Sequence, residues 1–252
     1  MRQSCTLAYY RTGVYPFLLL IAVFLSGCII SAEPEGFEEI RGSGILESQT
    51  VEVSDFTGVS MAIPGEVSIT QGETEALTIS AQANLLPYID IFVDNGLLRI
   101  ETEDDINIQP TRTIQVELAV RSLDEIIFAG DGLVVVDTLV TTNLEVTLAG
   151  SGDIEINQLT SVLLETSLAG SGDLFYSGIV DGQDIVLAGS GDIEARTLES
   201  KNVNIEIAGS GSAVLNVSDE LTALIVGSGS VRYLGSPSVE TTIVGSGTVG
   251  PL

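Results

Sequence analysis

The chain has 252 residues and a formal net charge of −26; it carries no His and 27 Gly, and only 5% of its residues are aromatic. Such an acidic chain opposes binding to nucleic acid, and the missing His excludes Ser-His-Asp triads, Cys-His pairs and His-based metal sites. Abundant Gly, few aromatic residues and no capped helical pattern after residue 30 predict an all-β protein of short strands and tight turns.

The first 27 residues have the pattern of a secretory signal peptide. Arg2 and Arg11 make the start basic, and residues 14–25 form an apolar run with small residues at its exit. A membrane-spanning helix needs about 20 apolar residues, so this run is too short to span comfortably. We therefore expect residues 1–27 to direct export and then to be removed.

A lipid anchor is expected at Cys28. Leu25-Ser26-Gly27-Cys28 resembles the bacterial lipobox, and this resemblance implies that Cys28 is acylated after cleavage. Several acyl chains together hold a protein firmly on a membrane; an ordinary signal peptide with an incidental cysteine is the alternative. Ile29 rather than Asp follows Cys28, which favours the outer membrane. The expected location is therefore the bacterial cell envelope, with the protein secreted and lipid-anchored in the outer membrane.

Two less regular stretches come before the repeats. Residues 28–44 are acidic and contain Pro34 and three Gly residues, which predicts a flexible tether. Residues 45–125 predict an irregular β region. Within it, Asn95-Gly96 lies between two apolar runs, a pattern typical of a β-hairpin turn.

Residues 126–252 are organised by a repeated Ala-Gly-Ser-Gly-Asp motif that drifts in sequence toward the end. The first glycines of its seven copies are 18 to 20 residues apart, which indicates a repeat architecture; they stand at 130, 150, 170, 189, 209, 227 and 245. In the copy at 144–156, the Leu, Val and Ile residues and both glycines share one parity, so they face one side of a strand. The sequence therefore predicts a right-handed parallel β-helix with coils of about 18–20 residues.

The two glycines of each copy fall where a coil has to bend. A missing Cβ permits positive φ and close backbone approach, so we expect these residues at an inside corner of the coil. The expected corner glycines are Gly150, Gly152, Gly170, Gly172, Gly189, Gly191, Gly209, Gly211, Gly227, Gly229, Gly245 and Gly247. Serine and aspartate have the opposite parity and should point outward. They form the candidate binding rows Ser151, Asp153, Ser171, Asp173, Ser190, Asp192, Ser210, Ser228 and Ser246.

Asp153, Asp173 and Asp192 stand in register on successive coils of this arrangement. Like charges stacked in this way repel one another, so the row needs a stabilising cause. Either the carboxylates accept hydrogen bonds from turn amides, or they bind a cation such as Ca²⁺. The period of 18–20 residues with one Asp differs from that of a nine-residue calcium repeat, which favours the structural interpretation. No cofactor is expected.

Several motifs in a fixed order resemble a known family. They are Phe56-x-x-Val59, Val67–Gly72, Ala83–Leu86, Asn95–Ile100, Leu123–Gly132 and the later Gly-Ser-Gly copies. Together they resemble the putative auto-transporter adhesin head domain, or GIN domain, over residues 45–250. The resemblance implies a β-helical fold on a secreted or lipid-anchored bacterial protein, and it supplies no catalytic residues.

These features predict a non-enzymatic module for adhesion, binding or scaffolding at the cell envelope. Its expected partners are the membrane, through Cys28, and an envelope polysaccharide or protein; no nucleic acid is expected. One alternative is a glycan-active β-helix enzyme, since a solenoid can hold paired carboxylates. Another is a structural assembly module, in which the uncapped coil end at 249–252 pairs with a second copy to form a homo-oligomer.

Overall fold

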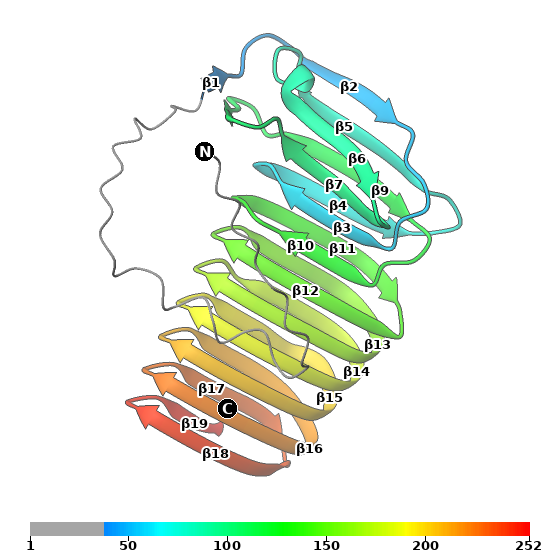
Figure 1. The fold of residues 1–252 in the computed structure, drawn as a ribbon. Coiled ribbons are helices and arrows are strands. Elements are labelled where there is room, and N and C mark those ends of the chain that lie inside the picture. The colour runs from blue at the N-terminus through cyan, green and yellow to red at the C-terminus, as the bar shows by residue number, and fades with distance from the viewer. Residues whose placement is uncertain (1–37) are drawn as a thin grey trace, which may run out of the picture. The chain divides into compact units, whose positions relative to one another are not determined.

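The strands of the computed structural model, which describes residues 38–252, stack as a parallel β-solenoid of about six turns (Figure 1). This confirms the predicted all-β, parallel coiled fold. The expected signal peptide, Cys28 and the first part of the expected tether lie outside the described residues. Within residues 38–252, no helix has the length and apolar character needed to cross a membrane.

Each coil has two sides, and the long strands run from one side to the other through a bend. Residues 153–160 of β13 pair with β11, whereas residues 163–170 of the same strand pair with β12. The strands of the regular coils are β10 (Glu125–Phe128), β11 (Gly132–Val140), β12 (Asn143–Gly150), β13 (Asp153–Gly170), β14 (Leu174–Gly189), β15 (Asp192–Gly209) and β16 (Ser212–Gly227). The last coil consists of β17 (Ser230–Gly235), β18 (Ser238–Gly245) and β19 (Thr248–Pro251).

The core consists of like residues stacked on successive coils. Leu148 pairs in register with Leu168, which in turn pairs with Leu187, and the column continues through Ile207 to Ile225. All five side chains are buried. Because each coil buries its inward side chains only against the coils above and below, every coil depends on its neighbours for its apolar core.

The predicted irregular β region forms the first coils and closes their free end. β3 (Gly58–Ala62) and β4 (Gly65–Gln71) pair in parallel with β10 and β11 on one side. On the other side they pair in parallel with β7 (Leu97–Thr102) and β9 (Gln115–Val120). The pairing then becomes antiparallel: β6 (Ile89–Asp94) lies on β7, β5 (Ala76–Gln82) on β9, and β2 (Leu46–Val51) on β5. We call β2, β5 and β6 the cap; the short 3-10 helix η1 (Leu86–Tyr88) leads into β6.

The prediction that the tether extends to residue 44 is wrong over residues 38–41. These residues form β1 (Glu38–Arg41), which pairs in parallel with β8 (Ile106–Gln109). Ile40 packs against the core, and the side-chain amide of Asn84 donates a hydrogen bond of 2.9 Å to the Arg41 carbonyl oxygen. An apolar contact and backbone pairing therefore fix a segment whose composition alone favours a flexible linker.

Candidate functional site

The Gly-Ser-Gly corners of successive coils line up along one edge of the solenoid. We call their serines the serine ridge, which comprises Ser151, Ser171, Ser190, Ser210, Ser228 and Ser246; all six are exposed. The ridge backbone is fixed from coil to coil, since the Ser171 N–H donates to the Gly150 carbonyl (3.0 Å) and the Ser190 N–H to that of Gly170 (2.9 Å). The hydroxyls themselves make no hydrogen bond within residues 38–252. Because paired strands lie about 4.8 Å apart, the ridge presents one free hydroxyl per such step.

The first glycine of each copy has a backbone conformation that L side chains rarely adopt. Its φ lies between 132° and 146° at Gly150, Gly170, Gly189, Gly209, Gly227 and Gly245. A Cβ at Gly170 would also overlap the carbonyl oxygen of Gly150 on the preceding coil. Conformation and close approach thus both require glycine at this position.

The second glycine of the early copies is needed for space alone. Gly152, Gly172, Gly191 and Gly211 are buried and do not have positive φ. A Cβ at Gly172 would overlap the Gly152 carbonyl oxygen and approach the Leu148 side chain. At Gly229 and Gly247 a Cβ would lie 2.6 Å from the side chains of Ile207 and Ile225, and 2.8 Å from a carbonyl oxygen of the preceding coil. These glycines let each corner close over the core of the coil before it.

Beside the serine ridge, the aspartates of the motif connect adjacent coils. The Asp173 N–H donates to Oδ1 of Asp153 at 2.9 Å, and the Asp192 N–H donates to Oδ1 of Asp173 at 2.9 Å. At the next coil, the N–H and hydroxyl of Ser212 both donate to Oδ1 of Asp192, at 3.1 and 2.7 Å. Residues 38–252 contain no group of three or more His, Cys, Asp or Glu residues suited to holding a metal ion. The hydrogen bonds therefore support the structural interpretation of this row.

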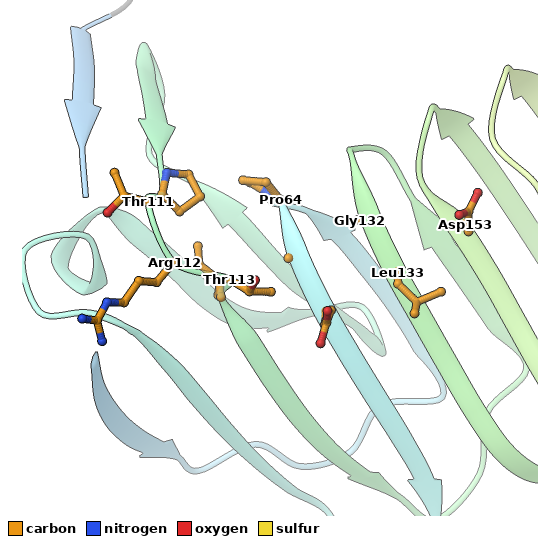
Figure 2. A pocket seen from close by; sticks show the side chains of 11 residues that line it. Pro64, Thr111, Arg112, Thr113, Gly132, Leu133 and Asp153 are labelled. Carbon is orange, nitrogen blue, oxygen red and sulfur yellow. The ribbon is translucent and has the colours of Figure 1, made fainter. Parts of the chain in front are cut away.

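A groove of about 590 Å³ lies at the start of the same edge, where the loop 110–114 between β8 and β9 approaches the first corners (Figure 2). Its lining includes Pro64, Glu66, Arg112, Leu133 and Asp153. Glu66, Leu133 and Asp153 form one column, because the first two pair in register and so do the last two. The groove is thus a continuation of the aspartate row, with Arg112 as its one basic lining residue.

Sequence reasoning did not find this groove. The loop 110–114 precedes the first recognisable copy of the motif, and nothing in the motif predicts that this loop approaches the corners. The available sequence signal was the Pro64-Gly65 pair, which is typical of a turn. In the structure Gly65 has φ 148° and pairs in register with Gly132. The corner column therefore begins before the first recognisable Gly-Ser-Gly copy.

The aromatic residues of the repeats divide between core and surface. Tyr176 is 2% exposed and its hydroxyl lies 3.4 Å from Oγ1 of Thr166. Burial raises the pKa of the Tyr176 phenol well above its usual range. Phe175, the neighbouring residue, is exposed on the outer surface. Neither belongs to the serine ridge or to the groove lining.

The comparisons with known proteins agree with this architecture. A family model described as putative auto-transporter adhesin, head GIN domain, matches residues 55–237. The chain belongs to this family. The resemblance to the GIN domain is thereby confirmed, and β18 and β19 lie beyond the matched region. The adhesin-like description of the family suggests a protein associated with the cell envelope or surface.

Solved structures with the same fold carry related names. The GIN domain of this chain is similar to a putative adhesin from Bacteroides fragilis, with a TM-score of 0.79 and 25% identity over 84% of this chain and 100% of the other. It is also similar to a putative lipid binding protein from Parabacteroides distasonis, with a TM-score of 0.73 and 25% identity over 85% and 100% of the two chains. A putative adhesin from Parabacteroides merdae shares the fold, at 24% identity and a TM-score of 0.65, over 85% of this chain and 99% of its own. The search of curated proteins finds no match.

Proposed function

We propose that this GIN-domain protein is a non-enzymatic binding module of the bacterial cell envelope, and that the serine ridge contacts an extended, hydroxyl-rich ligand such as an envelope polysaccharide. The observation that carries the proposal is the row of six exposed hydroxyls, none of which has a hydrogen-bond partner in residues 38–252. Such groups can donate and accept hydrogen bonds with a polymer that runs along the coil axis. The adhesin names of the family and of its solved relatives support the same role.

The ridge is preorganised for binding. Positive φ at the first glycines and the coil-to-coil bonds from the serine N–H groups hold each hydroxyl-bearing residue in place before a ligand arrives. A rigid surface loses less conformational entropy on binding than a flexible one, so many weak contacts can add up to useful affinity. The ridge is also an outer edge rather than a concave site, which favours adhesion over catalysis.

A capture experiment tests the ridge directly. We expect the triple variant Ser171→Lys, Ser190→Lys, Ser210→Lys to lose at least tenfold in capture of isolated envelope polysaccharide. The matched control carries Thr138→Lys, Gln158→Lys and Thr197→Lys. These substitutions add the same charge at exposed positions of β11, β13 and β15, outside the serine ridge. Unchanged capture by the ridge variant, or an equal loss in the control, would reject the ridge as the contact surface. Release of shortened glycan by the native protein would favour the enzymatic alternative instead.

The lipid anchor at Cys28 and the outer-membrane location belong to the same proposal. The lipobox-like Leu25-Ser26-Gly27-Cys28 supports both, because an acylated amino terminus would hold the binding module at a membrane surface. Metabolic labelling with a fatty acid should mark the native protein and not Cys28→Ser. Equal labelling of both proteins, or recovery of the native protein in the soluble fraction, would contradict the anchor.

A further inference from the structure

The last coil of the described chain leaves one edge of the solenoid open (Figure 1). β18 pairs with β16 along its whole length, from Ser238 opposite Glu220 to Gly245 opposite Gly227. No described strand pairs with its other edge, and all eight residues of β18 are exposed. The backbone N–H and C=O groups of that edge are therefore available for pairing with another strand.

This edge also exposes side chains that belong to core columns. Val239 stacks on Leu221 and Ile243 on Ile225, and both lower residues are fully buried. Val239 and Ile243 are nevertheless 38% and 40% exposed, because no coil covers them. Val244 is the most exposed of the Val and Ile residues of β18, in a column that holds alanine at Ala149, Ala169, Ala188 and Ala208.

The edge lacks the features that usually prevent strand association. β18 contains no Lys and no Pro, and most of its residues are Val, Ile or Thr, which favour extended pairing. Glu240 is its one charged residue. Residues 228–252 carry one other charged side chain, that of Arg232, so the side-chain charges of this coil sum to zero in a chain with a net charge of −26. Charge repulsion that opposes contact between most surfaces of two copies is weak here.

At the opposite end of the solenoid, β2 and β6 also have one edge without a described partner, but that end is acidic. There the parallel coils give way to the antiparallel cap strands, and Glu47, Asp90 and Asp94 are exposed on β2 and β6. Contact between the neutral edge of one copy and the cap of another would lack complementary charges. A contact between like ends is self-complementary and closes after two copies, whereas a head-to-tail contact would continue into a fibre.

We propose that the β18 edge binds a second copy of this chain, with the two β18 strands antiparallel across a two-fold axis. The two solenoids then form one continuous β-sheet structure, in which Val239 and Ile243 of both copies are covered. The contact is limited to the end of one coil, which is smaller than the roughly 1,600 Å² typical of stable complexes. The dimer is therefore reversible and depends on local concentration.

Disulfide trapping and sedimentation of the full chain in mild detergent test the proposal. Thr242→Cys places a thiol on β18, and we expect it to give a cross-linked dimer under oxidation. Gln49→Cys places a thiol on the exposed cap strand β2 and should give at least tenfold less cross-linked product. A ladder of higher oligomers, or efficient cross-linking between the Thr242→Cys and Gln49→Cys proteins when mixed, would overturn the like-end contact in favour of a head-to-tail one.

A charge variant separates specific pairing from chance encounters. Thr241→Lys with Ile243→Lys places like charges opposite each other in the dimer, and we expect the dissociation constant measured by sedimentation to rise at least tenfold. Leu46→Lys with Gln49→Lys adds the same charge on the cap and should leave it unchanged; circular dichroism checks the fold of both variants. A native protein that is monomeric at every concentration and gives no cross-link with Thr242→Cys would overturn the proposal. Dimers that persist unchanged in the Thr241→Lys, Ile243→Lys variant would overturn it as well.

Discussion

The carboxylate of Asp173 accepts a hydrogen bond of 2.9 Å from the backbone N–H of Asp192 on the next coil. We expect Asp173→Ala to lower the free energy of unfolding by about 1–2 kcal/mol, because this N–H loses its acceptor. Asp173→Asn keeps an oxygen at the same position and removes one of three stacked charges, so its stability should equal or exceed that of the native protein. Urea denaturation of both variants checks this. Equal losses for Ala and Asn would show that the charge, rather than the hydrogen bond, is what matters.

Gly172 provides a test of the corner. A methyl group there would overlap the Gly152 carbonyl oxygen, so Gly172→Ala must shift the backbone of two coils. We expect a loss of about 3 kcal/mol, at the upper end of typical overpacking costs. Gly72→Ala is the control, because a Cβ at Gly72 meets nothing within 4 Å; it should change stability by less than about 0.5 kcal/mol. Similar melting temperatures for the two variants would contradict the proposed steric role of the corner glycine.

The buried phenol of Tyr176 makes stability sensitive to alkaline pH. Burial raises the pKa of Tyr176 in the folded protein, whereas in the unfolded chain the phenol titrates near its ordinary value of about 10. The native state therefore retains a proton that the unfolded state loses, and stability decreases as the pH rises above about 10. The slope should approach 1.4 kcal/mol per pH unit from this residue alone. Tyr176→Phe should remove that contribution in urea denaturation between pH 9 and 11, and an unchanged slope would contradict it.

Gln183 occupies a core column that holds Leu144 and Leu164 on the two preceding coils. It is 1% exposed; its Nε2 donates to Ser200 Oγ at 2.6 Å, whereas its Oε1 has no partner among residues 38–252. We expect Gln183→Leu to stabilise the fold by about 1 kcal/mol, since a buried unpaired oxygen is removed and Ser200 still donates to the Asn216 carbonyl. Gln183→Ala is the comparison and should destabilise it by leaving a cavity. A destabilising Leu variant would show that the amide carries a role beyond packing.

Much of the regular part of this fold was predictable, because it is determined by the repeat of 18–20 residues and by the alternation of inward and outward side chains along each strand. Leu144 and Leu164 stack as the repeat predicts, and the Asn95-Gly96 turn joins antiparallel β6 and β7 with positive φ at both residues. The antiparallel pairing of the cap was not predictable, since the alternating apolar pattern of a strand such as β5 is the same for a parallel and for an antiparallel partner. β1 was missed because its pairing with β8 depends on residues far away in sequence. The groove was missed because its lining joins the loop at Arg112 to a corner column that precedes the recognisable motif.

In-register pairing of whole coils has a mechanical consequence. The bonds between strands run along the stack axis, so a pull between the cap and the last coil loads all coil boundaries in series, and the weakest boundary ruptures first. Each rupture would release one repeat of 18–20 residues, or roughly 65 Å of extended chain. A force–extension trace should therefore show a series of similar steps rather than one cooperative event. A surface protein built in this way lengthens under load while its remaining coils stay folded.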